Sequence, residues 1–177
     1  MEEDYLDEEF SIMYRESGRT HVLDSNTLKR PVRNLKVRKP MVIDAGQTLQ
    51  DAISVMQSKK FGCLLVTSEG SRLAGILTER DILMKALGEK RNFKEIRIRE
   101  IMTPDPESVQ PDDSIAFVMN AMHVGGYRHV PVVDERHVPV AVVSVKDIVA
   151  FIVENFPEEI LNLPPKTSRQ TPQQNGG

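Results

Sequence analysis

Apolar residues follow two different spacings along the first half of the chain, and each spacing predicts a type of element. Between positions 49 and 56 they recur every three or four residues, which predicts an amphipathic helix with Thr48 at its N-cap. Two short continuous apolar runs follow, typical of buried strands, and a turn cluster separates them. A second helix is expected to start at Thr78 and to stop at Gly88. The predicted order is a strand, a helix over 49–56, strands over 63–66 and 73–77, and a helix over 78–87.

The second half of the chain repeats this order at a constant offset of 66 positions. The offset relates Thr78 to Ser144 and Asp81 to Asp147, and it holds without a gap from position 40 to position 149. A pattern that stays in register over such a length predicts a duplicated supersecondary unit. The expected copies are a helix over 115–122 that breaks at Gly125-Gly126, strands over 129–133 and 138–143, and a helix over 144–152.

The composition is that of an ordinary globular protein. Of the 177 residues, 40% are hydrophobic and 28% are charged. The net charge of −3 gives no overall basic field, so nucleic acid is not the default partner. No apolar run approaches the ~20 residues of a membrane span, and the acidic start of the chain is unlike a leader sequence. Cys63 is the only cysteine, which excludes an intrachain disulfide and a thiolate metal cluster. We expect a soluble, cytoplasmic protein without a metal site.

The two ends of the chain differ in composition from the repeats. Six of the first nine residues are acidic, which suits either a docking peptide for a partner or, as is commoner for charge runs, a solvated tail. Six cations follow between Lys29 and Lys39; they could contact phosphates, but we expect them to pair with the acidic head or to face water. The expected division is an N-terminal arm over 1–33, a first domain over 34–92, a second domain over 93–157 and a flexible C-terminal tail over 158–177.

Several motifs, in register and in order, resemble the cystathionine β-synthase (CBS) domain. In each repeat an apolar run ends in a hydroxyl residue, and an aspartate follows three places later. The second repeat adds the lead-in Ile98–Thr103 and the strand Arg128–Asp134. The resemblance covers residues 37–156, and the tandem pair is similar to a Bateman module. One departure is Ala141, which stands where the family usually has glycine.

The resemblance implies an α+β fold in which two β-α-β-β-α repeats pack about a pseudo-twofold axis. It also implies two clefts that commonly bind adenosine-containing ligands, and a disc-shaped homodimer of two modules. It places Thr78, Asp81, Thr103, Tyr127, Arg128 and His129 around the first cleft. Around the second cleft it places Met41, Phe61, Gly62, Cys63, Ser144 and Asp147.

The two hydroxyl-x-x-Asp turns have chemistry that suits a nucleotide. The first amides of a helix are unpaired and attract phosphate, and the hydroxyls of Thr78 and Ser144 can donate to a phosphate oxygen. The carboxylates of Asp81 and Asp147 can accept hydrogen bonds from both hydroxyls of a ribose. The same spacing also fits a helix capping box, which needs no ligand.

The two predicted clefts differ in charge. Arg128 and His129 border the first cleft, whereas Gly62 and Cys63 stand at the matching positions of the second. We therefore expect the Thr78/Asp81 cleft to prefer the more phosphorylated or tighter-binding nucleotide. His129 is equally compatible with a half-buried structural role at the start of a strand.

The usual catalytic signatures are missing from the sequence, including the phosphate-binding Gly-x4-Gly-Lys loop and the Gly-x-Ser-x-Gly elbow. Our leading hypothesis is a non-catalytic, energy-sensing regulatory protein that binds AMP, ADP or ATP without a tightly bound cofactor, and that changes a protein partner or its own assembly. The alternatives are a structural homodimer with empty clefts that works through its acidic arm, and a nucleic-acid-associated protein that uses the Lys29–Lys39 stretch.

Overall fold

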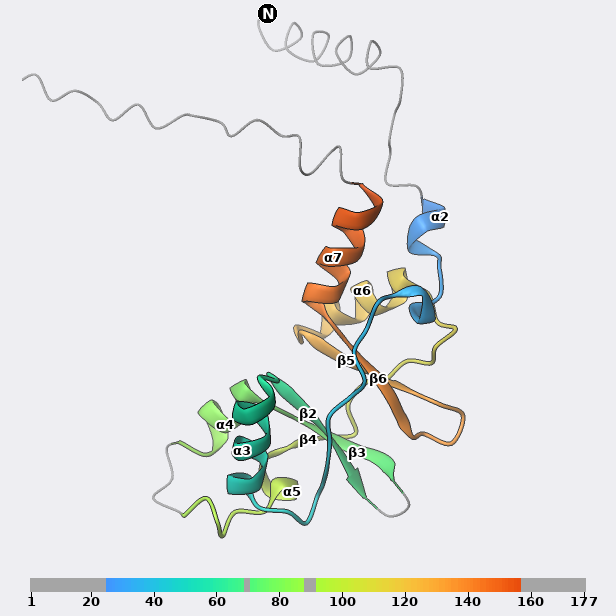
Figure 1. The fold of residues 1–177 in the computed structure, drawn as a ribbon. Coiled ribbons are helices and arrows are strands. Elements are labelled where there is room, and N and C mark those ends of the chain that lie inside the picture. The colour runs from blue at the N-terminus through green and yellow to red at the C-terminus, as the bar shows by residue number, and fades with distance from the viewer. Residues whose placement is uncertain (1–24, 69–70, 88–91, 157–177) are drawn as a thin grey trace, which may run out of the picture.

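The computed structural model describes residues 25–68, 71–87 and 92–156, which form two lobes that correspond to the two repeats (Figure 1). The first lobe contains β1 (Val42–Asp44), α3 (Leu49–Lys59), β2 (Cys63–Ser68), β3 (Arg72–Thr78) and α4 (Glu79–Lys85). The second lobe contains α6 (Ile115–Gly125), β5 (His129–Val133), β6 (Pro139–Ser144) and α7 (Val145–Asn155). The lead-in to the first repeat forms α2 (Ser25–Leu28) and η1 (Val32–Asn34), and the lead-in to the second forms α5 (Ile98–Ile101) and β4 (Thr103–Pro104). The predicted α+β class and the two repeats are confirmed.

Hydroxyl side chains cap the N-termini of three helices at the positions that the sequence predicted. Thr48, Thr78 and Ser144 each cap a helix and share a capping box with the aspartate three residues later. The ends of α3 and α6 also correspond, because Lys60 and Gly126 both adopt the left-handed conformation, with φ of 56° and 66°. Gly88, the acidic head and the C-terminal tail lie outside the described residues.

The two sheets are unequal. The first has four strands in the order β1-β2-β3-β4, and the second has the antiparallel pair β5-β6. In the first, β1 is parallel to β2, and Ile43 lies opposite Val66. The corresponding residues of the second repeat, Val109 and Val132, form only an isolated parallel bridge.

Each repeat is completed by the lead-in of the other. Val32 and Leu35 pack in the core of the second repeat, whereas Ile98 and Ile101 pack in the core of the first. The expected boundary at residue 33 therefore lies within a segment that packs on the second repeat.

Backbone hydrogen bonds follow the same exchange. The Ile115 amide donates to the Arg30 carbonyl at 2.9 Å, and the Leu49 amide donates to the Ile96 carbonyl at 2.9 Å. The offset of 66 positions relates both the two donors and the two acceptors. Such reciprocal contacts are what a pseudo-twofold relation between the repeats requires.

The sheets of the two lobes meet in the middle of the molecule, and the longer helices lie to the outside (Figure 1). A small apolar cluster joins them, with Leu65 and Ile76 from the first sheet against Val133 and Val142 from the second. At this junction Thr78 at the end of β3, His129 at the start of β5 and Ser144 at the end of β6 come close enough to line one cavity. No helix in the described ranges is long and apolar enough to cross a membrane.

Candidate functional site

A cavity of about 720 Å³ lies between the repeats, and its walls come from both of them. The first repeat contributes the end of β3 and the start of α4, and the second contributes the start of β5 and the first turn of α7. The whole residue set predicted for the first cleft lines it: Thr78, Asp81, Thr103, Tyr127, Arg128 and His129. Gly62 and Ser144, predicted for the second cleft, line the same cavity.

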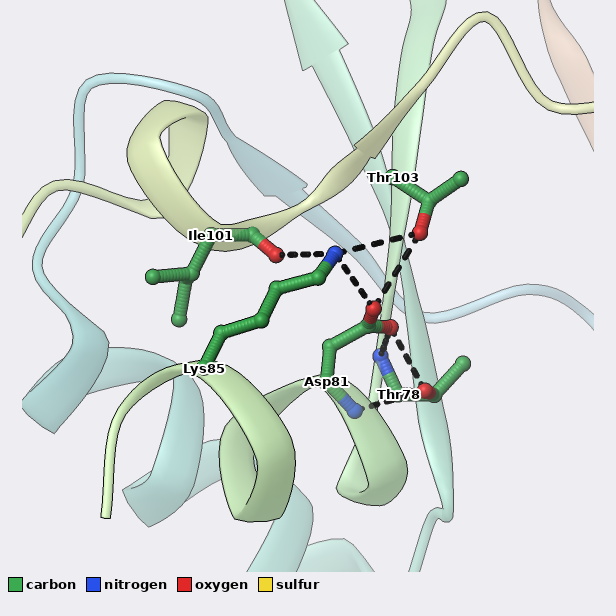
Figure 2. A network of polar contacts seen from close by, with 5 residues as sticks. All are labelled: Thr78, Asp81, Lys85, Ile101 and Thr103. Carbon is green, nitrogen blue, oxygen red and sulfur yellow. Dashed lines mark hydrogen bonds and ion pairs between the residues drawn. The ribbon is translucent and has the colours of Figure 1, made fainter. Parts of the chain in front are cut away.

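The carboxylate of Asp81 is held by four hydrogen-bond donors (Figure 2). Its Oδ2 accepts from the amide and the hydroxyl of Thr78, at 2.9 and 2.6 Å. Its Oδ1 accepts from the Lys85 ammonium at 2.7 Å and from the Thr103 hydroxyl at 3.1 Å. A carboxylate has about four lone-pair positions, so these donors occupy them all. Together they hold the carboxylate in one orientation at the wall of the cavity.

Lys85 fixes this network from the side of α4. Its ammonium also donates to the carbonyl of Ile101 at 3.0 Å, so it joins α4 to the end of α5 (Figure 2). Burial alone would raise the pKa of Asp81, but the hydrogen bonds from Lys85 and Thr78 outweigh it and lower that pKa below its ordinary value. Asp81 is therefore ionised at neutral pH and keeps the charge that ribose hydroxyls would meet.

Asp147 has the same cap but a different environment. Its Oδ2 accepts from the amide and hydroxyl of Ser144, at 2.8 and 2.6 Å. Within the described part of the chain, its Oδ1 receives no hydrogen bond, and Asp147 does not line the cavity. The two turns are thus equivalent as caps, but only the first places its aspartate in the wall of the cavity.

Tyr127 and His129 are both neutral at physiological pH. Partial burial and a hydrogen bond to Glu107 raise the pKa of Tyr127 to about 12. Burial and the neighbouring Arg128 lower the pKa of His129, against the opposite effect of Asp147 and Glu79. At neutral pH the predicted cationic pair therefore carries the charge of Arg128 alone.

Two further cations, which were not among the residues predicted from the sequence, also line the cavity. Arg80 and Lys146 occupy the position before the aspartate in the two turns, so they are related by the offset of 66. The sequence contains a signal that could have identified them, because a basic residue stands at the same position in both copies of the turn.

Fewer backbone amides are free to bind a phosphate at the starts of α4 and α7 than the sequence predicted. The Glu79 amide donates to Gly62 and the Val145 amide to Arg128, at 3.1 and 3.0 Å. The amides of Asp81 and Asp147 bond to their capping hydroxyls. Of the first three amides of each helix, only those of Arg80 and Lys146 remain for a ligand.

The other residues predicted for the second cleft are dispersed. Cys63 is buried, and this burial, with the Glu79 carboxylate nearby, raises the pKa of its thiol to about 11, as suits a packing residue. Met41 packs against the first core. Phe61 lines a separate cavity of about 770 Å³ between α3 and α4. The described residues contain no group of three or more potential metal ligands.

Comparison with known proteins explains the duplicated fold. The sequence model of the CBS domain matches the chain twice, over residues 32–88 and 98–154. The chain belongs to the CBS-domain family. The two matches correspond to the two lobes, and the hydroxyl residues of their turns, Thr78 and Ser144, both line the cavity between the lobes.

Relatives of this CBS-domain protein occur among plant proteins. It is 32% identical over 120 residues to the mitochondrial CBS domain-containing protein CBSX3 of Arabidopsis thaliana, covering 66% of this chain and 58% of CBSX3. It is 30% identical over 110 residues to the Arabidopsis protein CBSCBSPB1, covering 62% of this chain but only 20% of that longer relative. The whole-protein roles of such relatives therefore do not transfer directly.

Solved structures show the same architecture. The CBS domain protein NE2398 is 27% identical, with a TM-score of 0.65 over 70% of this chain and 98% of its own. The CBS domain pair of protein MJ0100, in complex with 5′-methylthioadenosine and S-adenosyl-L-methionine, is 25% identical, with a TM-score of 0.64 over 71% of this chain and 97% of its own.

Proposed function

We propose that this CBS-domain protein is a non-catalytic sensor that binds an adenine nucleotide in the Thr78/Asp81 cleft. The observation that carries the proposal is the cavity itself, which collects an ionised carboxylate and three cationic side chains from both repeats. Its volume of about 720 Å³ is within the usual range for small-molecule sites. Because the ligand touches both repeats, binding can change how they are held together, provided that the two arrangements differ in affinity.

The chemistry of the cavity assigns a part of the nucleotide to each wall. Asp81 and the Thr103 hydroxyl suit the ribose, and Arg80, Arg128 and Lys146 suit the phosphates. Four carboxylates line the same cavity, those of Glu79, Asp81, Asp105 and Glu107. Three cations do not make such a cavity strongly positive, which favours AMP or ADP over ATP as its ligand. The MJ0100 pair, which holds two adenosine-containing ligands, supports the ligand class.

We also propose that two copies of the chain associate through their outer helices. Leu83 and Met84 on α4 are 60% and 72% exposed, and Val149 on α7, the counterpart of Leu83, is 52% exposed. Apolar side chains at equivalent positions of both repeats suit a self-complementary interface. In analytical ultracentrifugation we expect a dimer that Leu83→Glu dissociates, whereas Arg136→Glu in the exposed β5–β6 turn leaves it intact.

A thermal-shift screen against AMP, ADP, ATP and S-adenosylmethionine tests the sensor. A ligand at 100 times its dissociation constant stabilises the folded state by about 2.7 kcal/mol, which raises the melting temperature measurably. Asp81→Ala should lose this increase. Asp51→Ala is the matched control, because Asp51 closes the same kind of capping box in α3 but does not line the cavity. It should lower the basal melting temperature and keep the ligand effect.

The alternative functions predict other results in the same experiment. If no ligand raises the melting temperature, the turns act only as caps and the scaffold hypothesis gains support. For the nucleic-acid hypothesis, two of the six cations in the basic stretch already have acidic partners, Arg33 with Asp112 and Lys36 with Glu154 at 2.9 Å, which reduces the charge available to a phosphate backbone. Strongly salt-dependent RNA or DNA binding that charge reversal at Lys36 weakens would support that hypothesis.

A further inference from the structure

The two repeats differ in one strand, because β3 of the first repeat has β4 as a neighbour and β6 of the second repeat has no equivalent neighbour in the described structure. On the side of the first repeat, β4 pairs with β3, with Thr103 opposite Ile76 and Pro104 opposite Gly75. This pairing brings the Thr103 hydroxyl to Asp81. On the side of the second repeat, the counterparts are Val37 and Arg38, and in the described structure they form no strand with β6.

The residue of the central strand that faces β4 differs between the two repeats by one methyl group. A Cβ on Gly75 would lie 2.5 Å from the Met102 sulfur and 2.9 Å from the Thr103 carbonyl oxygen. The sulfur ends a flexible side chain that can move, but the oxygen belongs to the backbone, so alanine at position 75 would push β4 away from β3. Ala141 is the counterpart of Gly75 and carries that methyl group.

The polar groups that hold Asp81 are also replaced on the second side. Val37 stands in place of Thr103, and Phe151 stands in place of Lys85. Phe151 is buried in the second core, and Val37 packs against the same core. Asp147 therefore lacks both the ammonium and the hydroxyl that fix the Oδ1 of Asp81.

We infer that this chain binds one adenosine ligand, at Asp81, and that Ala141, Val37 and Phe151 leave the pseudo-symmetric position at Asp147 without a site. The inference rests on the proposed function, and it adds which turn is used and how many ligands a chain holds. It also gives the two turns different roles: Thr78 and Asp81 bind the ligand, whereas Ser144 and Asp147 only cap α7.

Isothermal titration calorimetry with AMP, ADP and S-adenosylmethionine tests the inference. The chain should bind with a stoichiometry near one per chain. Asp81→Asn should weaken binding about tenfold or more, since a hydrogen bond to a charged group is lost. Asp147→Asn, which keeps an oxygen for the α7 cap, should leave affinity within about twofold.

Gly75→Ala and Ala141→Gly form the second pair of variants. Gly75→Ala should weaken binding about tenfold or more because it displaces Thr103, and Ala141→Gly should leave affinity within about twofold. Circular dichroism spectra and melting temperatures show whether each variant folds. A stoichiometry near two, or a loss of binding in folded Asp147→Asn but not in Asp81→Asn, overturns the inference and leaves the sensor in place. Absence of binding by all three compounds overturns the proposed function as well.

Discussion

Asp51, Asp81 and Asp147 make the same capping box, and their surroundings decide what else each can do. Asp51 is exposed and lies away from the cavity, and Asp147 has one carboxylate oxygen without a donor in the described structure. Only Asp81 combines a cap, an ion pair and a second hydroxyl. The residue pattern revealed the capping motif, but the ion pair from Lys85 depends on how α4 and α5 approach each other.

Lys85→Met tests the ion pair. Removing the ammonium should raise the pKa of Asp81 toward its ordinary value of 3.8, because the Lys85 hydrogen bond is the largest effect that lowers it. A carboxyl group with a lowered pKa in the folded state stabilises the fold above its unfolded pKa, and this contribution is lost as pH falls through the folded pKa. Lys85→Met should thus lower stability near pH 7 and lose most of that effect in acid. NMR titration of the Asp81 carboxyl carbon measures the pKa, and an unchanged value contradicts the role of Lys85.

At the scale of elements, the offset of 66 predicted the helix starts, the order helix, strand, strand, helix in each repeat and the break after α6, and the structure confirms them. It did not predict the unequal sheets. The exchange of glycine for alanine at residue 141 was visible in the sequence, but its effect depends on how closely Met102 and Thr103 approach Gly75. Sequence periodicity contains no such distance.

Lys60→Gly tests the helix ends. Lys60 adopts the left-handed conformation that its counterpart Gly126 adopts without steric cost. Glycine at position 60 should raise the free energy of unfolding by roughly 0.5–1 kcal/mol, measured by urea denaturation. The control, Lys59→Gly in the last turn of α3, should lower it by roughly 0.5–1 kcal/mol. Destabilisation by both variants would contradict the assigned role of Lys60.

At the scale of the whole molecule, the exchanged lead-ins make the two repeats depend on each other. The sequence predicted two domains in succession, and nothing in its periodicity indicated that Val32 would be buried in the second core. That core lacks part of its apolar surface unless residues 28–37 cover it. The repeats should therefore unfold together, and ligand binding at their junction should stabilise both.

Val32→Ala tests this dependence. The variant should cost roughly 2 kcal/mol, because Val32 is 1% exposed. In hydrogen–deuterium exchange, protection should fall first in α6 and β5 of the second repeat, although Val32 precedes the first. Ile98→Ala is the reciprocal control, and its loss of protection should begin in α3 and β2. Loss of protection confined to each variant's own repeat would contradict the exchange.

A crystal structure of the chain, soaked or co-crystallised with the ligand that the thermal-shift screen selects, would show directly where the adenosine ligand binds. We expect one ligand per chain, with its ribose hydroxyls on Asp81 and any phosphates near Arg80, Arg128 and Lys146. A ribose bound at Asp147 instead, or a ligand bound outside the junction of the two repeats, would contradict this expectation.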